Sequence, residues 1–171
     1  SPTQPAITAV VNAASFLPTA VHSGTSANPV PTAATSVSPR EIISIFGQNL
    51  GPAAVTSATP SGTPAVYPTG LAGIQVLFRF GSSPVTTVAA PIIVTSGNQV
   101  NCIVPTEVAA VIGKPSPNAT VEVWNGAAAT AAFPLTVVTE DPGVFTFGGL
   151  GQGQGAILNF DSATGSYVIN A

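Results

Sequence analysis

The residue types that catalysis most often uses are scarce in this chain. His22 is the single histidine, and it lies in a Ser/Thr/Gly loop with no acidic residue near it in the sequence. A Ser-His-Asp device needs a histidine held by a carboxylate beside the nucleophile, and a metal site built on one histidine needs carboxylate help. Cys102 stands alone inside the apolar run 100–104, which indicates a small buried residue rather than a nucleophile. These patterns predict a protein that is not an enzyme.

Two other patterns contain the residue types of ligand sites. Glu140 and Asp141 are adjacent acids, and with Asp161 they offer the oxygen ligands that Ca²⁺ accepts, although no calcium-loop spacing is present. A solvated turn is the simpler interpretation of the pair. The loop Gly148–Gly155 is rich in glycine, but a phosphate-binding loop leads directly into a helix, whereas residues 156–158 have a strand pattern. We therefore predict no cofactor, with Ca²⁺ near the three acids as a weak alternative.

The composition narrows the class of protein. Only 5% of the 171 residues are charged, with 3 basic and 6 acidic side chains, and the mean hydropathy is +0.48. Three basic residues cannot neutralise a phosphate backbone, which argues against nucleic acid as a partner. Pro, Gly, Asn or Thr interrupts every apolar run before the ~18 residues of a spanning helix, so we expect no membrane insertion. The start at Ser1-Pro2 indicates a processed chain or a fragment, and a removed signal peptide is the simplest explanation. With the Ser/Thr/Ala/Gly-rich surface, it predicts a secreted protein, extracellular or at the cell surface.

Short strand patterns separated by turns run along the chain. In Glu41–Pro52 an apolar β-branched run is stopped within six residues by two glycines, an asparagine and a proline. Gly73–Phe80 alternates between apolar and mixed positions, and Asn125-Gly126 is a two-residue hairpin signal. Thr106–Ile112 is the one stretch with the pattern of a helical turn. Eight or nine short strands with almost no helix predict an all-β fold, an antiparallel β-sandwich.

EIISIFGQNLGP at Glu41–Pro52 resembles the first-strand signature of IPT/TIG domains, which are immunoglobulin-like sandwiches with the pattern I-x-I-x-G-x-N-[LF]. The longer order is most similar to a conserved domain of unassigned function in large secreted acidobacterial proteins. Its pieces here are VVNAASF (10–16), EIISIFGQNLGPA (41–53), GLAGIQVLF (70–78), PIIVTSGNQVNCIVP (91–105), TVEVWNG (120–126) and PGVFTFGGLGQGQGAILNFD (142–161). The resemblance implies an extracellular immunoglobulin-like module, and it implies no catalytic residues.

The expected organisation has four parts. Residues 1–16 form an extended N-terminal arm and first strand, and residues 17–39 form a Pro/Ser/Thr-rich loop that is longer than the family pattern usually allows. Residues 40–141 form the immunoglobulin-like sandwich core. Residues 142–171 form C-terminal strands that belong to the same domain or begin a second, truncated one, since family members tend to continue beyond this point.

Trp124 is the most informative exposed candidate. If Val121 and Val123 face the core, Trp124 points outward beside Glu122, because neighbours on a strand alternate between faces. An outward tryptophan can be an isolated or shielded residue, an interface anchor or a platform on which a sugar ring stacks. Leu77 extends the same patch.

These observations predict a structural module that self-associates, as a homo-oligomer or polymer, into a fibre, filament or surface assembly by strand addition. The segments expected to add are Ser1–Phe16 and Ser166–Ala171, the second especially if the end of the chain leaves a strand without its partner. The alternative is a carbohydrate- or surface-binding adhesion module with glycans as partners. The candidate interface residues are Trp124, Leu77, Ile7, Val10, Val11, Tyr167, Val168 and Ile169.

Overall fold

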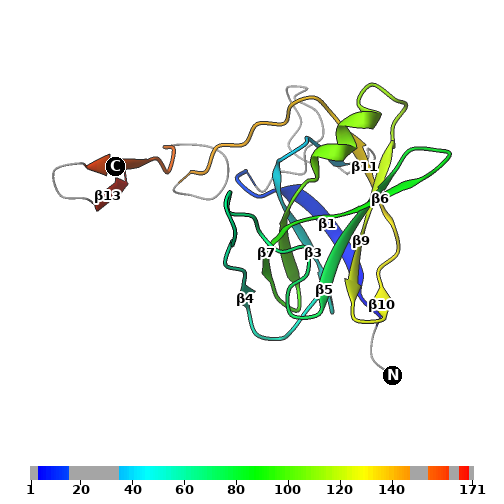
Figure 1. The fold of residues 1–171 in the computed structure, drawn as a ribbon, viewed down its shortest axis with the longest axis horizontal. Coiled ribbons are helices and arrows are strands. Elements are labelled where there is room, and N and C mark those ends of the chain that lie inside the picture. The colour runs from blue at the N-terminus through cyan, green and yellow to red at the C-terminus, as the bar shows by residue number, and fades with distance from the viewer. Residues whose placement is uncertain (1–3, 16–34, 147–153, 162–165, 170–171) are drawn as a thin grey trace, which may run out of the picture.

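The computed structural model describes residues 4–15, 35–146, 154–161 and 166–169, which form an all-β sandwich followed by a separate two-stranded sheet (Figure 1). The predicted β-sandwich is confirmed. The first sheet has the order β1 (Ala6–Asn12), β3 (Ile42–Gln48), β8 (Gln99–Ile103), β7 (Ile92–Thr95) and β4 (Thr56–Ser57). The second has the order β2 (Thr35–Val37), β11 (Phe133–Val137), β9 (Ala119–Asn125), β5 (Ile74–Phe80) and β6 (Thr86–Ala89), with β10 (Ala128–Ala129) also paired to β9.

The core lies between the two sheets and follows directly from the period-two alternation of the strands. On β5 the side chains of Ile74, Val76 and Phe78 are fully buried while Gln75 is exposed. β3 contributes Ile43 and Ile45 to the same core. Alternate side chains of a strand point to opposite faces, so one face of each sheet packs inward and the other is left outside.

The chain reversal after β3 has the geometry expected from its residue types. A Cβ at Gly47 would lie 3.0 Å from the carbonyl carbon of Ala6 and 3.1 Å from the Leu50 side chain, so β1 can approach only a glycine here. Asn49 adopts a φ of 54°, which asparagine tolerates better than most residues. At the predicted hairpin, Gly126 has a φ of 60° and β10 pairs with β9. Thr106–Val111 forms a short 3₁₀ helix, where a single helical turn was expected.

The sandwich extends beyond the predicted core of residues 40–141. β1 pairs along its length with β3, so the N-terminal strand belongs to the first sheet. β2 lies within the segment predicted as loop, because it pairs in parallel with β11 through Leu135, Thr136 and Val137. The next two pairings in this sheet, β11 with β9 and β9 with β5, are antiparallel. Pairing with strands distant in sequence therefore adds two strands to the domain.

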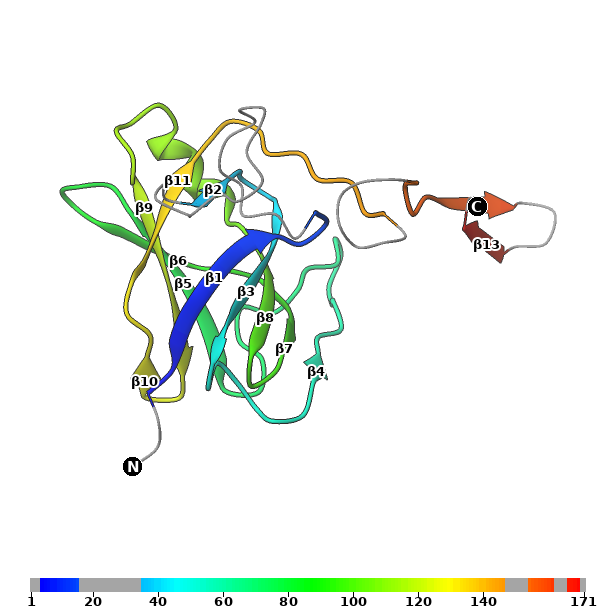
Figure 2. The same cartoon turned by 180° about the vertical axis from the view of Figure 1, so that it is seen from behind.

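The C-terminal part of the chain leaves the sandwich. We call its described residues, 140–146, 154–161 and 166–169, the C-terminal arm. It contains a bridge between Thr146 and Gly155 and then the antiparallel pair β12 (Leu158–Asp161) and β13 (Ser166–Ile169). Figures 1 and 2 show this pair well to one side of both sheets. In the described part of the chain, no helix has the length and apolar character needed to cross a membrane.

Candidate functional site

The arm leaves the sandwich next to a tight turn that precedes β3. Glu41 N–H donates to the carbonyl of Ser38 at 3.2 Å, Pro39 occupies the second position and Arg40 has a φ of 71°. This is the geometry of a type II turn, with proline where φ is pre-set and a left-handed residue after it. The turn brings the Glu41 carboxylate back over its own backbone, where Oε2 accepts the Ser38 N–H at 2.7 Å. The Ser38 hydroxyl donates to the same oxygen at 3.3 Å.

Asn12, at the end of β1, connects this turn to the arm. Its Nδ2 donates to Oε1 of Glu41 at 3.0 Å and to the backbone carbonyl of Asp141 at 3.2 Å. Its Oδ1 accepts the backbone N–H groups of Ala14 at 2.9 Å and Ser15 at 3.2 Å. The Asn12 side chain thus holds together three segments that are far apart in sequence. We call Asn12, Ser38, Glu41 and Asp141 the root cluster.

A pocket of about 470 Å³ opens at the root cluster. It is lined by the end of β1, by the Ser38–Glu41 turn, by the segment from Thr139 to Gly143 and by Phe145. Glu41 is 9% exposed and Asn12 is 4% exposed, whereas Arg40 and Glu140 are exposed. The carboxyl group of Glu41 is therefore buried yet borders a space that opens to solvent.

The electrostatics of the cluster favour a proton on Glu41. Burial, which disfavours the charged form, is the main cause, and it raises the pKa of Glu41 from 4.5 to about 7. The Ser38 backbone donor acts in the opposite direction, the nearby Asp141 carboxylate raises the pKa further, and the Asn12 and Ser38 side-chain donors lower it. Glu41 can accordingly gain or lose a proton near neutral pH, unlike an exposed glutamate.

The arm carries large apolar side chains that remain in contact with solvent. Val144, Phe145 and Ile157 are 61%, 53% and 54% exposed. Backbone pairing keeps them together, since Ala156 N–H donates to the Phe145 carbonyl at 2.7 Å. Ile42, at the sandwich side of the pocket, is 37% exposed. Clustered apolar exposure of this kind is a common feature of interaction surfaces.

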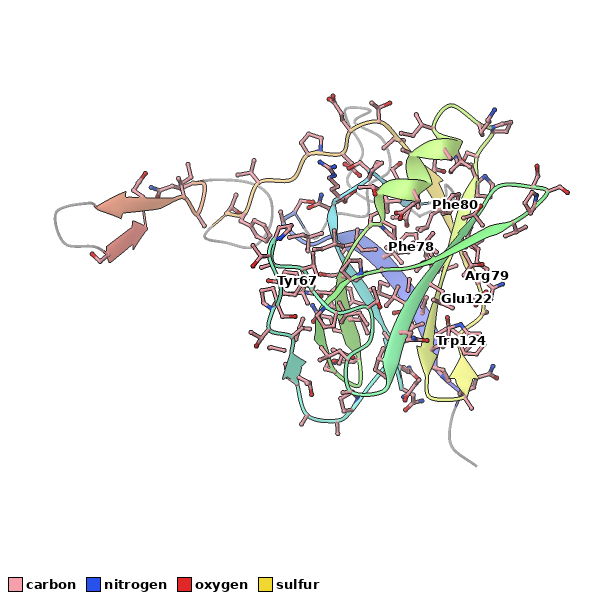
Figure 3. All side chains as sticks on the ribbon, in the orientation of Figure 1. Tyr67, Phe78, Arg79, Phe80, Glu122 and Trp124 are labelled. Atoms are coloured by element: carbon pink, nitrogen blue, oxygen red, sulfur yellow. The ribbon has the colours of Figure 1, made fainter. Side chains whose placement is uncertain are left out.

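A second candidate surface lies on the outer face of the second sheet. Trp124 points outward with Glu122, as predicted, because Val121 and Val123 are fully buried. The indole Nε1–H donates to Oε2 of Glu122 at 3.1 Å, and Arg79 forms an ion pair with Oε1 at 3.2 Å. Figure 3 shows Arg79, Glu122 and Trp124 in succession along this face. Leu77, half-buried, pairs with Glu122 across the strands.

The N-terminal interface candidates lie in β1 of the first sheet. Val10 and Val11 are only 1% and 6% exposed, and Ile7 is half-buried against the core. β1 pairs with β3, so all three belong to the sandwich, where Val10 and Val11 are buried and Ile7 keeps part of its surface exposed. Tyr167, Val168 and Ile169 lie in β13, within the arm.

The other chemical candidates do not converge on one site. His22 and residues 148–153 of the glycine-rich loop lie outside the described residues. Cys102 is fully buried, and burial raises the pKa of its thiol far above the usual range. Glu140 is exposed, Asp141 is half-buried and Asp161 lies in β12. Within the described ranges, no three His, Cys, Asp or Glu side chains are grouped so that they could hold a metal ion.

Sequence reasoning missed Asn12 and Glu41 as a site. Glu41 was interpreted as the start of a scaffold strand and Asn12 as part of a first strand. The available signal was weak: a charged residue stands directly before the most apolar strand, after Pro39. The fold buries the Glu41 carboxylate and places the Asn12 and Ser38 donors against it.

Comparisons of the chain with models of protein families, with curated proteins and with solved structures find no match. The function has to be inferred from the geometry of the arm, the root cluster and the outer face of the second sheet.

Proposed function

We propose that this chain is a non-enzymatic structural module that associates with other copies of itself through its C-terminal arm. The observation that carries the proposal is the pair β12–β13, which is paired with no further strand in the described part of the chain. An isolated two-stranded hairpin is marginally stable in water. A strand from a neighbouring copy can add to an outer edge of such a pair through backbone N–H and C=O groups.

The exposed apolar side chains of the arm support the same proposal. Full burial of a Val, Ile or Phe side chain stabilises a structure by roughly 1.5–3 kcal/mol. Val144, Phe145 and Ile157 are each more than half exposed, so covering them contributes on the order of 1 kcal/mol per residue. A net charge of −3 over 171 residues opposes association only weakly.

The proposed assembly is an extracellular fibre or surface layer of immunoglobulin-like modules. The IPT/TIG resemblance and the low-charge composition favour this setting. An arm that protrudes from one side of a module and docks on a different surface of the next copy makes a heterologous contact. Such contacts form rings or open filaments, whereas a self-complementary patch forms a closed dimer.

The test uses the full chain and a single residue of β13. Val168→Pro removes a backbone N–H and disfavours strand pairing, whereas the matched control Val168→Thr keeps a β-branched side chain. We expect sedimentation velocity and negative-stain images to show concentration-dependent assembly for the native chain and the control, and monomers for the proline variant. Thermal unfolding of the sandwich should be the same in all three. A native chain that stays monomeric at high concentration contradicts the proposal.

The outer face of the second sheet favours one alternative, a carbohydrate-binding module. Trp124 is fixed there by its bond to Glu122, and Gln75 lies opposite it on β5, so an aromatic ring stands among groups that hydrogen-bond to sugars. In a glycan-binding assay, Trp124→Ala should then abolish binding while assembly is unchanged. Binding that survives this substitution contradicts the alternative.

A further inference from the structure

We propose that the root cluster is a proton-operated latch that controls how firmly the C-terminal arm is held against the sandwich. The inference rests on the proposed function, in which the arm is the docking element, and it adds a means of regulation. Protonated Glu41 keeps the start of the arm in place. Ionised Glu41 favours an open arrangement in which water reaches its carboxylate.

Two contacts between the sandwich and the arm involve the side chain of Asn12. Asn12 Nδ2 is shared between Oε1 of Glu41 and the carbonyl of Asp141, at 3.0 and 3.2 Å. Gly143 lies directly against the same amide, since a Cβ built on it would be 2.7 Å from Cγ and 2.8 Å from Nδ2 of Asn12. Any change in the hydration of Glu41 therefore acts on the group that binds the arm.

The charged groups around Glu41 determine which of its protonation states favours opening. Asp141 and Glu140 face the pocket from the arm, and Arg40 lines it from the turn, where it is exposed to solvent. From β1 the neighbour is the uncharged Asn12. Behind the turn, Val104 after β8 exchanges backbone hydrogen bonds with Arg40 and Glu41. Loss of the Glu41 proton thus places a second negative charge near Asp141 in a largely buried site, and opening the pocket relieves this cost.

The size of the effect follows from proton linkage. The pKa of Glu41 is about 7 in the closed cluster and 4.5 when the group is free. If opening restores the free value, the opening constant rises roughly 70-fold between about pH 5 and pH 8. Screening by water in the open pocket reduces this, so we expect a change on the order of 10- to 70-fold.

The test measures the position of the arm directly. Spin labels are placed at Ser57→Cys on β4 and Ser166→Cys on β13, both exposed positions, and Cys102 is buried. Pulsed dipolar spectroscopy at concentrations where sedimentation shows monomers then reports the label–label distance. We expect a narrow distribution at pH 5 and a broad one at pH 8.

Three substitutions separate a latch from a merely structural role. Asp141→Asn should lower the pH midpoint of the transition, since the Asp141 charge raises the pKa of Glu41. Glu41→Gln should remove the pH dependence. Its NH₂ group also replaces an oxygen that accepts from Asn12 or from Ser38, so the arm is looser at every pH. Glu140→Gln, on the same segment but exposed, is the matched control and should leave the midpoint where it is.

Equal distributions at pH 5 and pH 8 would overturn the latch, and so would a transition that persists in Glu41→Gln or a midpoint that Asp141→Asn does not move. These outcomes are distinct from failure of the proposed function. If the arm opens with pH but the chain never associates, the latch is supported and the proposed structural function is contradicted. If the chain associates in a way that Val168→Pro prevents but shows no pH transition, the structural function is supported and the latch is contradicted.

Discussion

Gly143→Ala tests whether the arm is held at Asn12. The new Cβ would overlap Oδ1 of Asn12 and lie 2.7 Å from Cγ, so either the Asn12 side chain or the arm must move. Moving Asn12 disrupts its bonds to Glu41, to Asp141 and to two backbone N–H groups, which costs about 4 kcal/mol at roughly 1 kcal/mol per bond. Moving the arm disrupts the bond to the Asp141 carbonyl and nearby packing, about 1–2 kcal/mol. We therefore expect the arm to move.

The assay combines hydrogen exchange with urea unfolding. In Gly143→Ala we expect faster exchange in peptides covering residues 138–146, unchanged exchange in β5 and β9, and a loss of unfolding free energy of no more than about 2 kcal/mol. Gly70→Ala is the matched control, because the nearest atom to its added Cβ is 3.8 Å away. Unchanged exchange in Gly143→Ala would refute the contact between arm and Asn12. A loss near 4 kcal/mol would show that Asn12 yields instead.

Three further expectations follow from burial. The free energy of unfolding should fall as the pH rises from 4.5 to above 7, because folded Glu41 retains a proton that the unfolded chain has released. A pKa raised from 4.5 to about 7 corresponds to a change of about 3.4 kcal/mol in this free energy. Solvent in the pocket reduces the expected change to about 2 kcal/mol. Urea titrations across this pH range should show the slope in the native chain and its loss in Glu41→Gln; a native chain whose stability rises over the range contradicts the assignment. Phe78→Ala should cost about 3–5 kcal/mol in chemical denaturation because Phe78 is fully buried in the core, and a loss below about 2 kcal/mol would contradict that position. Cys102 should not react with a thiol reagent at pH 8 until urea unfolds the chain, since burial raises the pKa of its thiol; rapid labelling of the native protein would show that the site is accessible.

The parts of the fold that were predictable depend on neighbours in sequence. The alternation in Gly73–Phe80 and the apolar run after Glu41 produce β5 and β3, since strand faces are set by period-two spacing. The turn at Asn125-Gly126 was predictable for the same reason, because left-handed backbone is a property of the residue types. The outward direction of Trp124 followed from the valines beside it.

Other elements exist only through pairing over long distances. β2 has three residues in a stretch rich in Ser, Thr and Pro, and it becomes a strand because β11 offers an edge about 100 residues later. Val10 and Val11, expected at an interface, are instead buried, because β1 joins the first sheet and Val10 packs into the core. The local sequence pattern does not distinguish a strand that pairs within its own chain from one that pairs with a neighbouring molecule.

By itself, the sequence determined the β-sandwich class, the principal turns and a chain of low charge, because spacing and composition act locally. The tertiary structure decided where ionisable chemistry is found. Asn12 lies 29 residues from Glu41 and 129 from Asp141, and only folding brings them together. In the folded chain, burial and the Asp141 carboxylate raise the pKa of Glu41. Glu41, the residue directly before β3, therefore becomes an ionisable group at the base of the arm.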